Sequence, residues 1–512
     1  MLLRVPNFVE PYWYGDEAIY LTIGQSMNKG AILYKEIIDH KTPLIYFLAQ
    51  THTQENFRVL LWGWMLVTTI AFYYFAQTLF SNKKWPTFIA TILFVLATSL
   101  PTFEGNIPNG ELFVMGFVLV GMLVLSQTSY ATSFLHPKAK KVKDSPAWMY
   151  IISGSFLSLG VLTKVPAIFD VAAAAGFGFF ESTNALLAAQ KNRLLILKKK
   201  FVKIVPIWFF LGVGIVLPIL LSIAYFVKLD AGSEYLQFGL MYNFRYAGSW
   251  GLPFDNPILV FFFSLPGKLV AMSFLTMLLV VTKKYISPAF QFILFWFGLS
   301  LFASLLSNRP YPHYYLQIAP ALSLLVAGTV YEGIKMLFKR TALQNKNILG
   351  PFLATVIFTG FVAILFLLKV QKYPTVAYYT SFIQLAKREI SVADYNQRFD
   401  SLMSDNYRVV ETMKACPDDH LFIWGTNPTL YALADKMPTG RFTVSFHIKD
   451  FNAYDETFND FVEDNPNYVV VMNKEDGAFP QFYQYLRKNY RPSQTQFDNF
   501  ALWHRIECTV TK

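Results

Sequence analysis

The sequence predicts a mainly α-helical membrane protein, with a polytopic bundle of transmembrane helices and a C-terminal extracytoplasmic α/β domain. Composition is the first observation behind this prediction: 54% of the 512 residues are hydrophobic and 15% are charged, whereas soluble domains carry about 25% charged residues. The second observation is a series of apolar stretches of membrane length. The third is an uneven distribution of Lys and Arg among the loops that connect them.

The apolar stretches number ten, and they reach or approach the roughly 20 residues that a spanning helix needs. They cover residues 57–80, 86–103, 110–130, 147–163, 165–187, 205–227, 257–281, 288–306, 314–334 and 349–369. Each is expected to be helical, because a backbone in lipid must satisfy its own hydrogen bonds. The chain therefore divides into a first loop (1–56), a bundle of about ten helices (57–370) and a C-terminal domain (371–512).

The connecting loops differ in charge. Alternate loops carry 18 Lys and Arg residues, and the opposite short loops carry four: Lys164, Lys228, Arg245 and Arg309. Because cytoplasmic loops are rich in basic residues, the first loop and the tail are expected outside the cytoplasm of a bacterial-type inner or plasma membrane. The net charge of +11 is spread over separate loops, so nucleic acid is not an expected partner.

The start of the chain does not explain how the first loop is exported. Residues 1–13 contain neither a signal peptide nor a spanning helix. We therefore expect that an upstream helix is missing from this sequence. The alternative is that the helix at 57–80 inserts with its N-terminus outside.

After residue 370 the pattern changes to short strands that alternate with helices. His420–Trp424 and Tyr468–Met472 are typical of buried strands, and the chain closes on a third apolar segment at 500–506. Helical patterns cover 394–415, 427–435, 454–465 and 479–489. This alternation predicts a small α/β domain. Its cysteines, Cys416 and Cys508, could form a disulfide in an oxidising compartment or remain independent thiols.

The first loop contains an acidic pair, Asp16 and Glu17. A carboxylate with a pKa near about 4 is ionised at neutral pH, and it could accept the proton of an acceptor hydroxyl. We therefore take Asp16 and Glu17 as candidate catalytic residues. The alternative is a helix N-cap with an acidic first turn, a position that Asp and Glu favour.

Asp39-His40-Lys41-Thr42-Pro43 follows in the same loop. Pro43 biases Thr42 toward an extended conformation and so fixes the chain beside Lys41. The Lys41 ammonium could bind the phosphate of a lipid, although a lysine at the start of a helix also snorkels to the interface. Asp39 and His40 carry ligand types that could hold a divalent ion.

Two further external loops carry candidate substrate-binding residues. The second loop holds Glu104, Asn109 and Glu111 and has no Lys or Arg, which favours a polar site shared with the first loop; the alternative is a solvated turn. A later turn holds Arg309 and His313, which could bind phosphate. The same turn holds the tyrosines 314 and 315, which could stack on a sugar ring. An aromatic belt with an interfacial arginine is the alternative for this turn.

Together these motifs resemble the membrane glycosyltransferases of the GT-C fold. The likeness is greatest to the family 39 protein mannosyltransferases and the related aminoarabinose and lipopolysaccharide-core sugar transferases. It rests on Trp13-Tyr-Gly-Asp16-Glu17-x-x-Tyr20, Gly30-x-x-x-Tyr34, Asp39-His-Lys41-Thr-Pro43-Leu-x-Tyr46, Glu104-Gly-Asn-x-x-Asn109-x-Glu111 and His313-Tyr-Tyr. The resemblance covers residues 1–370, and the tail resembles the variable external domain of these enzymes.

The resemblance implies a polyprenyl-phosphate monosaccharide donor, transfer outside the cytoplasm and inversion at the sugar carbon. The family's first-loop Asp corresponds to Asp16, the expected base, and its first-loop Lys corresponds to Lys41, which meets lipid phosphate. The family often has Glu before that lysine, whereas this sequence has His40, which leaves a metal role open. Further candidates for substrate binding are Tyr20, Glu104, Asn109, Glu111 and Tyr314. The acceptor, whether glycan, lipid or protein, is not specified.

Two other interpretations compete with a transferase. A transporter or flippase of lipid-linked sugars would be expected to show repeats, broken helices and midplane charges, whereas the charged residues here lie in loops and at helix ends. A non-catalytic membrane scaffold would use the external domain as its working part. Loss of transfer on removal of the Asp16 carboxylate would separate the enzyme from both.

Overall fold

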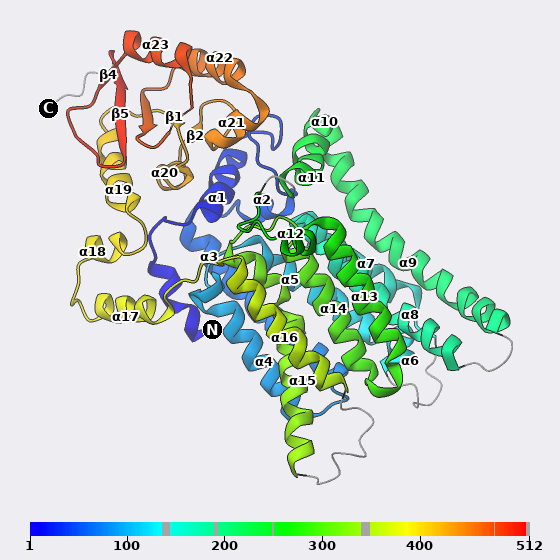
Figure 1. Cartoon of the computed structure of the whole chain (residues 1–512). Helices are drawn as coiled ribbons and strands as arrows, with labels where there is room; N and C mark the ends of the chain where they lie inside the picture. Colours follow the sequence, from blue (N-terminus) through cyan, green and yellow to red (C-terminus); the bar gives the residue numbers. More distant parts are fainter. Residues whose placement is uncertain (136–143, 189–192, 248–249, 339–348, 476, 508–512) are drawn as a thin grey trace. The chain divides into compact units, whose positions relative to one another are not determined.

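The computed structural model of the chain describes residues 1–135, 144–188, 193–247, 250–338, 349–475 and 477–507 (Figure 1). The chain forms two compact units that do not follow the order of the sequence. Unit 1 comprises Met1–Leu60, Ala224–Tyr242 and Pro374–Lys512, and unit 2 comprises Leu61–Ile223 and Asn243–Tyr373. The first loop and the C-terminal domain, which the sequence separates, therefore belong to the same compact unit.

The described part of the chain has a helix in every apolar stretch that was expected to span the membrane. These helices are α3 (Gln54–Leu79), α4 (Lys84–Ser99), α5 (Gly110–Ser126), α6 (Ser129–Leu135), α7 (Ala147–Thr163), α8 (Ile168–Ala188), α9 (Arg193–Lys228), α12 (Pro257–Phe263), α13 (Leu265–Val281), α14 (Pro288–Ser304), α15 (Ala319–Phe338) and α16 (Leu349–Leu367). Among the described residues, five helices are long and apolar enough to cross a membrane, or up to seven if each of two bent pairs counts as one span. The shorter apolar helices α4, α7 and α14 complete the set.

Small residues let two of these helices pack closely in unit 2. A Cβ atom added at Gly154 of α7 would lie 2.3 Å from the carbonyl oxygen of Leu211, and one at Gly214 of α9 would lie 2.2 Å from that of Ile151. The Ser158 hydroxyl also donates to the Ile215 carbonyl of α9, at 2.7 Å. Glycine and serine at facing positions are typical of helix pairs in lipid, where close backbone approach replaces the hydrophobic effect.

Three short helical turns connect the long helices at the loops that carry candidate residues. They are η2 (Pro101–Phe103), η3 (Val165–Ala167) and η6 (Pro312–Ile318). Each has Pro at its first or second position, where the missing N–H and the fixed φ of proline cost nothing. These turns hold Glu104, Lys164 and His313 at or next to the ends of long helices.

Unit 1 combines short helices with a five-stranded sheet. Its remaining helices are η1 (Leu2–Val9), α1 (Gly15–Asn28), α2 (Leu44–Leu48), α10 (Gly232–Glu234), η4 (Tyr235–Met241), α11 (Tyr242–Ala247, mostly in unit 2), α17 (Thr375–Ala386), α18 (Val392–Gln397), α19 (Leu402–Met413), α20 (Pro428–Ala434), α21 (Ser445–Phe451), α22 (Tyr454–Asp464) and α23 (Pro480–Asn489). The strands are β1 (His420–Trp424), β2 (Met437–Pro438), β3 (Tyr468–Met472), β4 (Tyr490–Pro492) and β5 (Phe500–Arg505).

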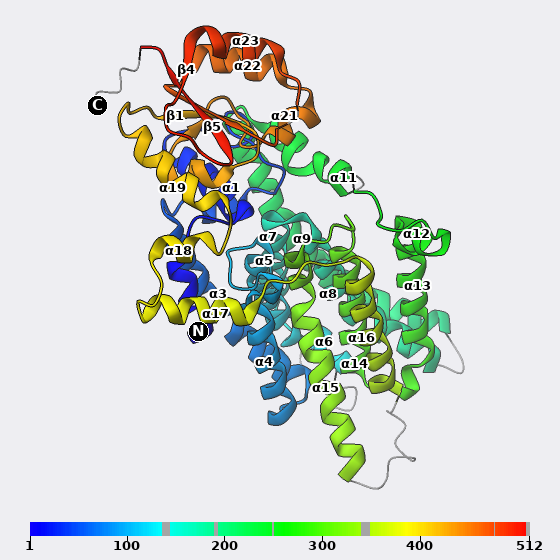
Figure 2. The ribbon, with the colours of Figure 1, turned by 60° about the vertical axis from the view of Figure 1, so that its left-hand side comes forward.

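The sheet has the order β2-β1-β3-β5-β4. The strand β1 runs parallel to β2 and β3, whereas β5 is antiparallel to β3 and β4. Alternate residues of β1 face opposite sides, as the period of a strand requires. Leu421 and Ile423 join the core with α19 and α20, while the Phe422 and Trp424 rings contact Phe482 of α23. Helices therefore cover both faces of the sheet (Figures 1 and 2).

The expected fold class is confirmed, with some local differences. The expected strands His420–Trp424 and Tyr468–Met472 are β1 and β3 with the same bounds, and 500–506 contains β5. The helix expected at 394–415 is instead two helices, α18 and α19, because the chain turns between them and the Asp400 side chain accepts from the Leu402 N–H at the start of α19, at 2.8 Å. Cys508 lies outside the described residues, so its pairing with Cys416 stays open.

Candidate functional site

The helix α1 places the acidic pair in its first turn. Tyr14 is the N-cap, with an extended backbone, and Asp16 and Glu17 follow in the first turn. An N-cap role for Asp16 is therefore excluded, but the acidic first turn that the alternative interpretation expected is present. Carboxylates at the N-terminal end of a helix are favoured by its dipole, so the sequence explains why Asp16 and Glu17 lie in the first turn of α1.

Asp16 and Lys41 meet in unit 1. The Lys41 Nζ lies 3.5 Å from Asp16 Oδ2 and 3.4 Å from Asp39 Oδ2. The Tyr20 hydroxyl donates to Asp16 Oδ2 at 3.2 Å, and Lys41 Nζ lies 4.9 Å from the centre of the Tyr20 ring, within cation–π range. The Asp16 side chain is 27% exposed, whereas that of Lys41 is 7% exposed. A carboxylate open to solvent thus stands beside a nearly buried cation.

Buried tyrosines fix the backbone around Lys41. The Tyr34 hydroxyl donates to the Lys41 carbonyl at 2.6 Å, and the Lys41 N–H donates to the Tyr46 hydroxyl at 3.2 Å. Pro43, the N-cap of α2, starts the helix that carries Tyr46. Both tyrosines belong to the motifs on which the resemblance rests, but their role in holding Lys41 could not be inferred from sequence.

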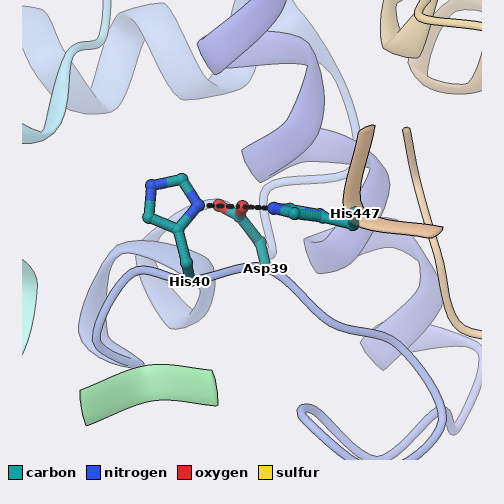
Figure 3. Close-up of side chains that lie close together, drawn as sticks. All are labelled: Asp39, His40 and His447. Carbon is teal, nitrogen blue, oxygen red and sulfur yellow. Dashed lines mark ion pairs between the residues drawn. The ribbon is translucent and has the colours of Figure 1, made fainter. Parts of the chain in front are cut away.

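Asp39 lies between Lys41 and two imidazoles. The Tyr46 hydroxyl donates to Asp39 Oδ2 at 2.7 Å. On the other carboxylate oxygen, Oδ1, the distances are 2.9 Å to His40 Nδ1 and 3.6 Å to His447 Nε2 (Figure 3). Burial acts to raise the pKa of the Asp39 carboxyl, but Lys41 and the imidazoles outweigh it, so the pKa lies well below its usual range. Asp39 is therefore a carboxylate.

His447 is a residue that the sequence analysis missed. It lies on α21, and burial lowers the pKa of its imidazole to about 4, although the nearby Asp39 charge opposes this. The first loop reaches α21 because Ile38 pairs with Phe442 and the Ile38 N–H donates to the Arg441 carbonyl at 2.9 Å. A lone histidine in a short helix gives no local signal that it will meet Asp39.

Glu17 belongs to a different cluster from Asp16. Arg58 Nε and Nη2 donate to its two carboxylate oxygens at 2.9 and 2.8 Å. Both side chains are buried, and Glu10 lies 3.7 Å from Arg58 Nη2. Burial is the main influence on the Glu17 carboxyl and raises its pKa, while Arg58 acts to lower it. This geometry gives Glu17 a structural ion pair with Arg58, and it offers no support for the catalytic role expected from sequence.

Unit 2 brings the candidates of the later loops together in pairs. His313 Nδ1 lies 2.6 Å from Glu104 Oε2, and the Lys164 ammonium pairs with Glu111. Lys164 Nζ also lies 4.6 Å from the centre of the Tyr314 ring. The acidic residues of the second loop are therefore paired with residues of two other loops, and Lys164 could not be found by a search within the second loop alone.

The two other candidates of unit 2 differ in surroundings. Asn109 is fully buried as the N-cap of α5, and its side-chain amide donates to the Glu104 carbonyl at 2.9 Å, so it holds the loop that carries Glu104. Arg309 lies over aromatic rings, with its guanidinium carbon 4.0 Å from the centre of the Tyr246 ring and 5.0 Å from that of Trp250. The aromatic environment expected for Arg309 is present, whereas phosphate binding stays a prediction.

The structure thus defines two clusters of candidate residues. Unit 1 holds Asp16, Tyr20, Lys41 and the Asp39 group, and unit 2 holds the Glu104–His313 and Glu111–Lys164 pairs. A single site shared by these loops stays a prediction.

Comparison with solved structures identifies the class of protein. ArnT from Cupriavidus metallidurans, bound to undecaprenyl phosphate, matches with a TM-score of 0.54 and 14% sequence identity, over 100% of this chain and 97% of that chain. At this identity the match defines the fold, which is of the GT-C type. The chain is therefore an integral membrane protein with a GT-C fold.

The other comparisons do not add to the assignment of the fold. The Archaeoglobus fulgidus oligosaccharyltransferase, in complex with zinc and sulfate, matches with a TM-score of 0.40 and 14% identity, over 96% of this chain and 69% of that chain. Its apo form matches with a TM-score of 0.40 and 13% identity, over 96% and 71%. We draw nothing from likeness at this level. No family model matches the sequence, and no curated protein matches it.

Proposed function

We propose that this protein is a membrane glycosyltransferase that moves a monosaccharide from a polyprenyl-phosphate donor to a glycan, lipid or protein acceptor. One observation carries the proposal. A part-exposed carboxylate, Asp16, lies 3.5 Å from the Lys41 ammonium, in a chain that shares its fold with ArnT bound to undecaprenyl phosphate. An acid–base group and a phosphate-binding cation side by side are what such a transfer needs.

The bonds and charges of the reaction match this pair. The acceptor oxygen or nitrogen forms a bond to the anomeric carbon while the bond from that carbon to the phosphate oxygen breaks. Asp16 takes the acceptor's proton. The electron pair of the broken bond stays on the lipid phosphate, where Lys41 stabilises the negative charge that grows in the transition state. Attack from the face opposite the phosphate inverts the configuration of the sugar carbon.

The donor phosphate would compete with carboxylates for Lys41. The distances from its ammonium to Asp16 and Asp39 are 3.5 and 3.4 Å, longer than the roughly 2.7–2.9 Å of a close charge-assisted hydrogen bond. A phosphate oxygen could therefore replace Asp16 at the ammonium, which would also release Asp16 to act as the base. The Arg309 and His313 side chains are further candidates for the phosphate, and Glu104, Glu111 and Tyr314 for the sugar or acceptor.

The charge pattern supports an extracytoplasmic reaction. Basic residues crowd alternate loops of the chain, and such loops stay in the cytoplasm. Unit 1, which contains Asp16 and Lys41, would then face the opposite side, as would the loops of Glu104 and His313. A polyprenyl-phosphate sugar presented at that surface could reach the first loop from the lipid.

The experiment is transfer from a polyprenyl-phosphate sugar by the purified protein in reconstituted membranes. Asp16→Asn preserves shape and removes the base, so turnover should fall by about 10²–10⁴-fold. Asp455→Asn is the matched control, because Asp455 also lies in the first turn of a helix, α22, and it should keep full activity. Wild-type turnover in Asp16→Asn would overturn the assignment. Translocation of the intact donor without cleavage of the sugar–phosphate bond would instead favour a flippase.

A further inference from the structure

Unit 2 contains a buried carboxylate that belongs to none of the pairs described above. Asp170 lies in α8, within a segment, Val165–Asn184, that is long and apolar enough to cross a membrane. The residue is only 2% exposed. Ionisable side chains in such segments are costly, and they usually serve a function. The neighbours of Asp170 indicate what that function is.

Both carboxylate oxygens of Asp170 accept hydrogen bonds from other elements. The Trp296 indole and the Ser300 hydroxyl of α14 donate to Oδ1 at 2.6 and 3.4 Å. The Gln317 amide of η6 donates to Oδ2 at 2.8 Å. All of these donors belong to buried residues. Asp170 therefore joins α8 to α14 through one oxygen and to η6 through the other.

Gln317 extends this network to the turn η3. The side-chain nitrogen that donates to Asp170 also donates to the Pro166 carbonyl of η3, at 3.1 Å. An amide nitrogen carries two hydrogens, so both are committed and the orientation of the amide is fixed. Pro166 follows closely after Lys164 in the sequence. The network therefore ends beside the residue that supplies the cation of the Glu111–Lys164 pair.

The two turns that Gln317 joins carry candidate substrate-binding residues. Lys164 is the N-cap of η3, and Tyr314 lies on η6, where its carbonyl accepts from the Ser304 hydroxyl at 2.8 Å. The Lys164 ammonium lies over the Tyr314 ring and pairs with Glu111. A shift of either turn would disturb this arrangement, and a displacement of about 1 Å in a site can cost about 10²-fold in rate.

We propose that Asp170 is a positioning residue for the substrate that binds at Glu111, Lys164 and Tyr314. It acts through Gln317, which holds η3 and η6 together. This inference rests on the proposed function, because it assigns a role within the proposed substrate site. Helix packing alone is the alternative, since polar side chains also join helices in lipid. For packing, the hydrogen bond from Trp296 matters as much as that from Gln317; for positioning, only the latter does.

The first test measures KM for donor and acceptor separately in the transfer assay. Glu111→Gln shows which substrate binds at this cluster, by the KM that it raises. Gln317→Leu removes the amide at similar volume, so it should raise the same KM, leave the other unchanged and lower kcat/KM by up to about 10²-fold. Trp296→Phe is the matched control, because it removes the other short hydrogen bond to Asp170. It should lower the Tm but keep both KM values.

A pair of variants separates positioning from packing at Asp170 itself. Asp170→Asn puts a donor where the carboxylate accepts, so it should lower the Tm and raise the same KM as Gln317→Leu. Adding Gln317→Glu exchanges donor and acceptor and restores their hydrogen bond, but a carboxylate cannot donate to the Pro166 carbonyl. The double variant should therefore regain Tm while its KM stays raised. Recovery of KM together with Tm would overturn the positioning role.

Hydrogen exchange in detergent provides a readout that needs no transfer. The Ala167 and Ile168 amides donate within η3, and they should exchange faster in Gln317→Leu but not in Trp296→Phe. Unchanged exchange and unchanged KM values in Gln317→Leu would overturn the positioning role and leave the transferase standing. So would a Glu111→Gln variant that transfers with both KM values of the wild type. A wild type that transfers no sugar would instead overturn the proposed function, and this assignment with it.

Discussion

At the scale of single residues, the surroundings of Lys41 bear on the choice between phosphate binding and interfacial anchoring. Its side chain is nearly buried and lies against Asp16, Asp39 and the Tyr20 ring, and tyrosines hold its backbone on both sides. A lysine that only snorkels to the interface would keep its head in water. The geometry of Lys41 therefore favours a cation held in place for a ligand.

If Lys41 has the proposed role, Lys41→Gln should weaken donor binding and slow turnover together, because an ammonium there would stabilise both the bound phosphate and the charge that grows on it. The measurement is the dependence of transfer rate on donor concentration in reconstituted membranes. Lys35→Gln provides the control, since Lys35 lies in the same loop but pairs with the exposed Asp230. Unchanged donor dependence and turnover in Lys41→Gln would leave Lys41 with an anchoring role only.

Glu17 and Arg58 should matter to stability more than to chemistry. Removal of one partner of a buried ion pair leaves an uncompensated charge, so Arg58→Ala should destabilise the protein by roughly 3–5 kcal/mol. Thermal unfolding in detergent would measure this loss. Arg408→Ala, which removes a half-exposed partner of Asp405, should cost at most about 1 kcal/mol. If Arg58→Ala were as stable as Arg408→Ala, the pair would have no structural role.

At the scale of elements, the contact between α7 and α9 shows how small residues let two helices of unit 2 approach closely. Gly154 faces the backbone of α9, and Gly214 faces that of α7. Neither contact leaves room for a Cβ atom. Since lipid removes the hydrophobic advantage of association, close packing and the hydrogen bond from Ser158 to the Ile215 carbonyl hold these two helices together.

Gly154→Val should therefore push the two helices apart and cost about 1–3 kcal/mol or more, the usual effect of overpacking. Gly212→Val in α9 is the control, because nothing lies within 4 Å of a Cβ atom added there. The readout is thermal stability of the two variants in the same detergent. Equal stability would mean that α7 and α9 can separate at no cost, contrary to the observed contact.

At the scale of the whole molecule, the charge pattern predicts on which side each region lies. In a chain whose own cysteines are replaced by serine, a cysteine at the exposed Lys474 should react with an impermeant reagent in intact cells. A cysteine at the exposed Lys284 should react only after the membrane is opened. The reverse pattern would invert the topology and remove the basis for an extracytoplasmic reaction.

The sequence predicted the helices and strands of this molecule better than it predicted which distant residues come into contact. The strands β1 and β3 are apolar runs with a clear signal, whereas β2 and β4 are only two and three residues long, too short for any periodicity to show. Asp16 and Lys41 share a loop, so their meeting was foreseeable. Asp39 and His447 come from distant parts of the chain that meet through contacts such as the pairing of Ile38 with Phe442, and no local pattern encodes that contact.

Unit 1 is built from three separate segments of the chain, which affects when it can fold during synthesis. Its residues come from the beginning, the middle and the end of the chain. Synthesis proceeds from the N-terminus, and regions generally fold as they emerge. The first loop, however, must wait for the last segment before α1 can pack on α20 and Asp39 can meet His447. An unfinished chain would therefore lack the contact of Asp39 with His447, although Asp16 and Lys41 had both been made.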